Sequence, residues 1–314
     1  MSVVLVAPGQ GSQTPGFLDP WLTEPRFARH LDALSEAAQV DLRTHGTVSD
    51  ADTIRDTTIA QPLIVAASLL TLSAVLGDEG EGRRARVAGI AGHSVGEFAA
   101  AAGAGILSEK DAMVLVAARG RAMAAAAAQV ATGMSAVIGA DETELLAKLD
   151  ELGLEPANFN GAGQIVVAGE LSALDTLREY PPAGARVIPL QVAGAFHTRF
   201  MAPAVESLRA VASGLHAADP SITIWTNRDG SRVTSGHAYL DLLVGQVASP
   251  VRWDLTMEAF AAAGVTGLIE LAPAGALVGL AKRGLKGLPT VAVKTPDDLD
   301  AARELIDTAG VSAE

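Results

Sequence analysis

The stretch VAGIAGHSVGEFAAAAGA, residues 87–104, decides the fold of this protein. Its apolar start, Val87–Ala91, predicts a buried strand, and Val95–Ala104 is alanine-rich with helical character. Between them, GHSVG at 92–96 matches the pattern G-x-S-x-G in the strand–turn–helix context that this pattern requires. The two glycines permit a sharp turn, so Ser94 is expected at the carboxyl edge of a sheet. The N-terminus of the following helix would there favour a developing oxyanion.

The segments on either side continue the alternation of strands and helices. Val3–Ala7 predicts another buried strand, which enters the loop Pro8–Gly16. Ser108–Ala128 predicts a helix with Ser108 as its N-cap. Gly267–Leu271 predicts a strand, and Ala276–Arg283 predicts a helix after it. The main body is therefore an α/β fold built of packed layers.

A second unit is predicted between residues 132 and 190, where the elements become shorter. Their β-α-β-β-α-β order suits a ferredoxin-like unit. Gly133 and the Pro181-Pro182 pair mark its ends, so the expected domains are 1–131 with 191–314, and an insert of 132–190. The expected elements are strands at Ser135–Ile138, Pro156–Phe159, Ile165–Ala168 and Arg186–Leu190, with helices at Glu142–Leu152 and Leu171–Tyr180.

Composition excludes several classes of function. The chain has 314 residues, 49% hydrophobic, with no cysteine, so a thiol nucleophile, a disulfide framework and a thiolate metal site are ruled out. A net charge of −13 opposes general nucleic-acid binding. The apolar start has no basic leader, and the longest apolar stretch, Ile64–Gly77, falls short of the ~20 residues of a membrane span. We expect a cytoplasmic protein that binds neither nucleic acid nor membrane.

A serine nucleophile needs a base, and histidine is the natural choice. His197, in GAFH at 194–197, follows the insert at the point where the chain returns to the main body. His93 lies inside the turn, where it can pack or hydrogen-bond locally. The remaining histidines lie in polar or helical surroundings that favour exposed positions: His30, His45, His216 and His237.

Two further features have two interpretations each. Arg119 lies in an apolar helical context, where its guanidinium requires a carboxylate from a substrate or from a structural salt bridge. The loop GQGSQ at 9–13 offers unblocked backbone N–H groups for an anion, or it is a plain connection. No lysine follows it in the spacing of a nucleotide-binding loop.

Taken together, the motifs resemble those of the malonyl-CoA:acyl carrier protein transacylases, in order and spacing, over essentially the whole chain. The motifs are GQGSQ at 9–13, GHSVGE at 92–97, Arg119, GAFH at 194–197, and Gln246 with PVRW at 250–253. The resemblance implies an α/β-hydrolase-like large domain with an inserted ferredoxin-like small domain.

The resemblance also implies roles for the residues of a catalytic dyad. Ser94 would be the nucleophile and His197 the base, with the backbone carbonyl of Gln246 orienting the imidazole. The N–H groups of Gln10 and Val95 would form the oxyanion hole.

The acyl pocket is implied in the same way. Arg119 would hold the malonyl carboxylate, and Met123, Phe196 and Asn160 would line or border the pocket. Similar methylmalonyl-selective domains carry a serine in place of Phe196, so the ring is expected to disfavour an α-methyl branch.

The implied reaction is a ping-pong transfer of malonyl from malonyl-CoA to the phosphopantetheine thiol of acyl carrier protein, with no metal or cofactor. Because such carriers are acidic, we expect Lys282, Arg283 and Lys286 to steer docking. Two alternatives stay open: an esterase or thioesterase that recruits His237 and Asp241, and a catalytically silent carrier-binding subunit.

Overall fold

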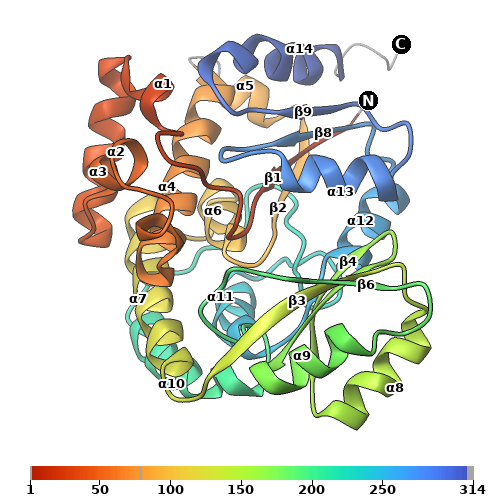
Figure 1. Cartoon of the computed structure of the whole chain (residues 1–314). Helices are drawn as coiled ribbons and strands as arrows, with labels where there is room; N and C mark the ends of the chain where they lie inside the picture. Colours follow the sequence, from red (N-terminus) through yellow and green to blue (C-terminus); the bar gives the residue numbers. More distant parts are fainter. Residues whose placement is uncertain (1, 78–79, 310–314) are drawn as a thin grey trace.

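The computed structural model describes residues 2–77 and 80–309 and contains two β-sheets (Figure 1). The chain alternates between strands and helices, as the sequence predicts. The strands are β1 Val3–Ala7, β2 Val87–Gly92, β3 Thr132–Ile138, β4 Glu155–Gly161, β5 Gln164–Glu170, β6 Arg186–Pro189, β7 Val251–Arg252, β8 Gly267–Glu270 and β9 Thr290–Ala292.

Helices cover both sheets. The α-helices are α1 Asp19–Leu22, α2 Pro25–Ala38, α3 Leu42–Thr47, α4 Thr57–Leu76, α5 Gly80–Arg84, α6 Gly96–Gly103, α7 Glu109–Ala127, α8 Glu142–Leu152, α9 Leu171–Glu179, α10 Ala202–Ala212, α11 Gly236–Gly245, α12 Trp253–Ala262, α13 Ala276–Gly284 and α14 Leu299–Ala309. Short 3-10 helices are η1 Thr53–Arg55, η3 Arg199–Met201, η4 Gln246–Ala248 and η5 Pro296–Asp298.

The first sheet is parallel and buried on both faces. Its strand order is β2-β1-β8-β9, and each adjacent pair runs in the same direction. Because successive strand residues point to opposite faces, Leu5 joins the core cluster that includes residues of α2, α4 and α7. Val4 and Val6 join a second cluster with Trp253 of α12 and Leu277 of α13. This two-sided burial explains why the strands are continuous apolar runs.

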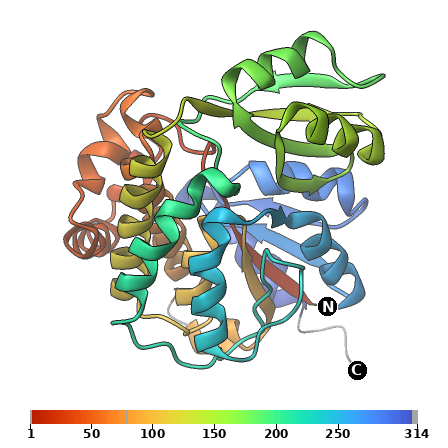
Figure 2. The same cartoon turned by 90° about the horizontal axis from the view of Figure 1, so that it is seen from below.

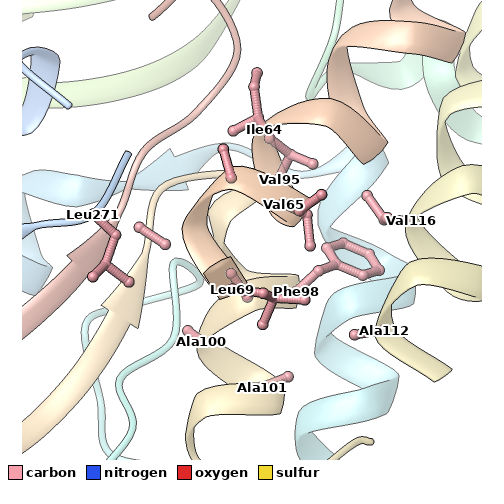
Figure 3. Close-up of a cluster of buried hydrophobic side chains, with 14 of the residues drawn as sticks. Ile64, Val65, Leu69, Val95, Phe98, Ala100, Ala101, Ala112, Val116 and Leu271 are labelled. Atoms are coloured by element: carbon pink, nitrogen blue, oxygen red, sulfur yellow. The ribbon is translucent and has the colours of Figure 1, made fainter. Parts of the chain in front are cut away.

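The turn at residues 92–96 between β2 and α6, here called the elbow, lies beside an interior of aliphatic and alanine side chains. Residues of α4, α6 and α7 meet around Phe98, and the alanines of α6 let these helices approach closely (Figure 3). Helix α4 is longer than the predicted apolar stretch, and its 20 residues have the length and composition of a membrane span. Most of its side chains are buried against the rest of the molecule.

The second sheet has the order β6-β3-β5-β4-β7. Its first four strands come from the predicted insert and pair antiparallel, with α8 and α9 packed on the sheet through Leu149 and Leu177 (Figure 2). The two-residue strand β7 was not predicted, and it adds to β4 in parallel from the opposite end of the chain. The sheet therefore extends beyond residues 132–190.

The element predictions agree closely with the structure. Helix α8 has the predicted bounds, and the Ser108 hydroxyl caps α7 by accepting a hydrogen bond from the Asp111 N–H at 3.0 Å. Strand β9 was not predicted, because it is three residues long and is defined by its pairing with β8.

Candidate active site

Ser94 lies on a tight turn between β2 and α6. Its φ of 53° is in the left-handed region, which side chains other than glycine rarely adopt. A Cβ at Gly92 would lie 2.0 Å from the Gly96 backbone, and one at Gly96 would lie 2.2 Å from the Ala7 carbonyl oxygen. The two glycines are therefore required by close backbone contacts, and the strained turn presents the Ser94 side chain above the sheet.

The Ser94 hydroxyl meets His197. Oγ lies 2.7 Å from Nε2, and the other ring nitrogen, Nδ1, lies 2.9 Å from the backbone carbonyl oxygen of Gln246. Since a carbonyl can only accept a hydrogen bond, Nδ1 carries the proton. Nε2 is therefore free to accept the proton of the serine hydroxyl.

The His197 imidazole is neutral at physiological pH. Burial lowers its pKa to about 3, the positive charge of Arg119 adds to this effect, and the hydrogen bond to Gln246 opposes it. His197 has a φ of 64°, and its N–H donates to the Val247 carbonyl at 3.0 Å. This backbone contact fixes the ring above the serine.

Arg119 is the buried cation of the site. It is 1% exposed, and Nη2 donates to Ser94 Oγ at 3.3 Å and to the Gln246 side-chain Oε1 at 2.8 Å. Among residues 2–77 and 80–309, Nε has no hydrogen-bond partner and no carboxylate forms an ion pair with Arg119. The described residues therefore form no salt bridge with Arg119, and the nearby Glu97 carboxylate acts on its charge from beyond ion-pair distance. The site holds a positive charge beside the serine with hydrogen-bonding capacity unused.

A buried carboxylate, Glu97, completes the polar cluster. It accepts hydrogen bonds from Gln246 Nε2, from the Asn227 N–H at 2.8 Å and from the Tyr239 hydroxyl at 3.3 Å. Burial raises its pKa to about 7, while these hydrogen bonds and the Arg119 charge oppose the shift.

Asn227 also supports the elbow directly. Its Oδ1 accepts from the Ser94 N–H at 2.7 Å, and its Nδ2 donates to the Gly92 carbonyl at 2.7 Å. Neither Glu97 nor Asn227 was assigned a role from the sequence. The one available signal was Glu97, an acidic residue at the start of an otherwise apolar helix.

The loop after β1 lies against the elbow. A Cβ at Gly9 would lie 3.0 Å from the His93 side chain. In the described part of the chain, no hydrogen bond uses the backbone N–H of Gln10 or Val95. Both N–H groups therefore remain available to a ligand.

The remaining predicted residues are buried near this centre. Met123 follows Arg119 by one helical turn, and its sulfur accepts from Gln61 Nε2 at 3.4 Å. Asn160 of β4 contacts His93 Nε2 through its Oδ1 at 2.9 Å, which joins the second sheet to the elbow. Phe196 directly precedes His197 and is 6% exposed.

The alternative hydrolase arrangement does not assemble. His237 is exposed, and Asp241 forms an ion pair with Arg209 at 3.1 Å. The orienting acceptor for His197 is the backbone of Gln246, which requires no carboxylate.

One cavity lies beside this polar cluster. A cavity of about 520 Å³ borders Glu97 and Gln246, and the described residues that line it do not include Ser94, His197 or Arg119. Within the described ranges, no group of three or more carboxylates and imidazoles could hold a metal ion.

A serine on a strand–turn–helix elbow, paired with a neutral imidazole, is the arrangement of proteins that transfer acyl groups through serine. The family model of the acyl transferase domain matches residues 4–303. The chain belongs to this family.

Named relatives cover nearly the whole chain. It is 52% identical over 307 residues to a malonyl CoA-acyl carrier protein transacylase of Mycobacterium tuberculosis, a match that covers 96% of this chain and 100% of the relative. A crystal structure of MCAT from Mycobacterium tuberculosis has a TM-score of 0.92 at 51% identity, covering 96% and 100% of the two chains. A type II PKS acyl-carrier protein in complex with its malonyl-transacylase gives a TM-score of 0.91 at 32% identity, covering 97% and 100%.

Proposed function

We propose that this chain is a malonyl-CoA:acyl carrier protein transacylase that works by a ping-pong mechanism through a malonyl ester on Ser94. The observation that carries the proposal is the meeting of three groups at one oxygen. Ser94 Oγ lies 2.7 Å from the neutral His197 imidazole and 3.3 Å from the Arg119 guanidinium, which has no carboxylate partner among the described residues. Relatives named as malonyl transacylases, and the structure titled as a complex with acyl-carrier protein, support this choice of substrates.

In the first half-reaction, His197 Nε2 accepts the Ser94 hydroxyl proton while Oγ attacks the thioester carbon of malonyl-CoA. The carbon–sulfur bond then breaks, and the coenzyme A thiolate takes the proton from the imidazolium. The product is the malonyl ester on Ser94. In the second half-reaction, the carrier's phosphopantetheine thiol gives its proton to His197 and attacks the ester carbon. Ser94 leaves as its alkoxide and regains the proton.

The oxyanion of each tetrahedral intermediate would be held by the N–H groups of Gln10 and Val95. The Ser94 N–H is already bonded to Asn227, which leaves the Val95 N–H, at the start of α6, as the elbow's free donor. A donor that is aimed at the developing charge in a buried site lowers the barrier more than it would in water.

Arg119 would bind the malonyl carboxylate. In a malonyl ester this carboxylate is separated from the ester carbon by one methylene, so a guanidinium in contact with Oγ is within its reach. Burial lowers the pKa of Arg119, and the nearby Glu97 opposes the shift; a guanidinium remains protonated at neutral pH. Met123, Phe196 and Asn160 would border the acyl group.

The architecture is proposed on the same basis. Residues 1–131 and 191–314 would form an α/β-hydrolase-like large domain around the parallel sheet, and 132–190 a ferredoxin-like insert. The strand order β6-β3-β5-β4, with α8 and α9 packed on that sheet, supports the second assignment. A cytoplasmic location remains a prediction.

Mass spectrometry after brief exposure to malonyl-CoA tests the covalent step. We expect a malonyl adduct on Ser94 that disappears when phosphopantetheinylated carrier is added, with malonyl appearing on the carrier. Free malonate without carrier acylation would favour a hydrolase. An unmodified chain would favour a silent carrier-binding subunit.

A further inference from the structure

We propose that Glu97 is a positioning residue that anchors the Gln246 side-chain amide and thereby holds Arg119 in place for a carboxylated acyl group. The inference rests on the proposed function and extends it to a residue that touches neither Ser94 Oγ nor His197. It concerns the choice between malonyl and acetyl groups.

The first step is the contact between Glu97 and Gln246. The Ser94 backbone carbonyl only accepts hydrogen bonds, so the end of the Gln246 amide that faces it and Glu97 Oε2 must be the NH₂ group, which donates to both. The other oxygen, Oε1, is occupied by the N–H of Asn227 and the hydroxyl of Tyr239. Glu97 is 1% exposed, so these protein donors are the main partners of its carboxylate.

The second step is the hydrogen bond that the other end of the Gln246 amide, Oε1, makes with Arg119. With Nε2 directed toward Glu97 and toward the Ser94 carbonyl at 3.0 Å, Oε1 faces Arg119 and accepts from Nη2 at 2.8 Å. If the amide were turned over, a donor would face the guanidinium and an oxygen would face the Ser94 carbonyl. Both contacts would be repulsive in a buried site.

The third step concerns the charge of Arg119. Gln246 Oε1 is a neutral acceptor, so it fixes the guanidinium without neutralising it. A carboxylate at position 246 would compete with the substrate for the same cation. The indirect chain from Glu97 through Gln246 to Arg119 thus orients the guanidinium and leaves its charge available for a malonyl carboxylate.

Glu97→Gln tests this chain with almost no change in shape. One oxygen at position 97 becomes an NH₂ group. The Asn227 N–H belongs to the backbone and cannot turn, so the remaining oxygen pairs with it, and the new NH₂ faces Gln246. This contact between two NH₂ groups is repulsive, so the Gln246 amide loses its anchor and is displaced from the position at which its Oε1 accepts from Arg119.

The assay compares kcat/KM for malonyl-CoA and acetyl-CoA with phosphopantetheinylated carrier, using the full chain. For Glu97→Gln we expect the malonyl value to fall by about 10–100-fold and the acetyl value to change by less than about threefold. The ratio of the two values does not depend on the fraction of folded enzyme. Equal losses for the two substrates, or an unchanged ratio, would overturn the proposal.

Tyr239→Phe is the matched control, since it also removes a hydrogen bond to Glu97 but leaves the Gln246 contact intact. In Tyr239→Phe, the ratio of kcat/KM for malonyl-CoA to that for acetyl-CoA should stay within about twofold of the wild-type ratio. If Glu97→Gln yields no folded protein, Gln246→Met breaks the second link and keeps the backbone carbonyl that His197 uses; an unchanged ratio there overturns the proposal. Failure of the proposed function is recognised separately, because wild type would then not transfer malonyl at all.

Discussion

Ser94 and His197 lie 103 residues apart in the chain, yet the hydroxyl oxygen of one is 2.7 Å from the ring nitrogen of the other. Both residues have positive φ angles, 53° and 64°. Such conformations cost on the order of 1–3 kcal/mol each and persist only where the surrounding structure enforces them. The close glycine contacts of the elbow enforce the first, and the hydrogen bond from His197 to Val247 supports the second.

Removing either member of this pair should stop acyl transfer. Ser94→Ala should form no malonyl-enzyme, and His197→Ala should lower the rate of coenzyme A release by about 10²–10⁴-fold, the usual contribution of a general base. His237→Ala is the control, because His237 is exposed and serves only the rival hydrolase arrangement. Rapid-quench measurement of coenzyme A release checks all three. Loss of activity in His237→Ala with retention in His197→Ala would reverse the assignment.

Arg119→Ala should discriminate between acyl groups. We expect a loss for malonyl-CoA of about 2–4 kcal/mol in transition-state stabilisation, as for a buried charge pair, and a smaller loss or a gain for acetyl-CoA. The measurement is kcat/KM for both substrates side by side. Arg121→Ala, an exposed arginine on the same helix, should leave both values unchanged. Equal losses in Arg119→Ala would count against carboxylate binding.

The buried His197 should make stability sensitive to acid. Because its folded pKa, about 3, lies below the ordinary value of 6.5, the unfolded chain binds more protons between these values, so stability is present above pH 6.5 and declines as pH falls. Between pH 7.5 and 5.0 this group lowers the free energy of unfolding by about 2 kcal/mol. Urea unfolding at pH 7.5 and 5.0 measures this effect. The free energy of unfolding should fall less between the two pH values in His197→Gln than in wild type. His93 is also buried with a lowered pKa, but it is present in both proteins and cancels. An equal loss in both would contradict the neutral, buried imidazole.

Phe196→Ser should relax selection against an α-methyl branch. The ring directly precedes His197 in the chain and is 6% exposed, and its removal opens space at the cost of about 3–5 kcal/mol of stability. We expect the ratio of kcat/KM for methylmalonyl-CoA to that for malonyl-CoA to rise by about tenfold. Phe200→Ser, in the neighbouring η3, should leave the ratio unchanged. A ratio that rises equally in both variants would assign the effect to general loosening.

Carrier docking should depend on exposed cations near the end of α13. Lys282, Arg283 and Lys286 are exposed, and Arg283 also donates to Gln164 Oε1 of β5 at 3.2 Å. In a protein of net charge −13, reversal of these three charges should raise KM for an acidic carrier, with KM for malonyl-CoA less affected.

The control is the same change of charge at a distant surface. Arg26, Arg29 and Arg43 are exposed on α2 and α3, and their reversal should leave the carrier KM near that of wild type. Measurement at two salt concentrations adds a second check, since electrostatic steering weakens with salt. An unchanged carrier KM in the α13 variant would reject docking at this surface.

Some elements could be predicted because short sequence patterns fix their backbone conformation. The glycines of GHSVG predicted the strand–turn–helix elbow, and Ser108 predicted the start of α7 by capping it. The full extent of α4 was missed, because this helix is apolar on every side and has no periodicity that marks its ends. Strand β7 was missed because two residues form a strand only when β4 lies beside them.

For the site, the sequence by itself determined which residue types were present. These are a serine on a glycine-bounded turn, a histidine at the point where the chain re-enters the main body, and an arginine in an apolar helix, with no cysteine in the chain. Only the tertiary structure decided that Arg119 has a neutral partner, Gln246, and that Glu97, Asn227 and Tyr239 share one buried cluster. The reason is physical: a turn or a cap is fixed by contacts between residues a few positions apart, whereas a buried hydrogen-bond network joins side chains that are more than 100 positions apart and exists only after the core has excluded water from them.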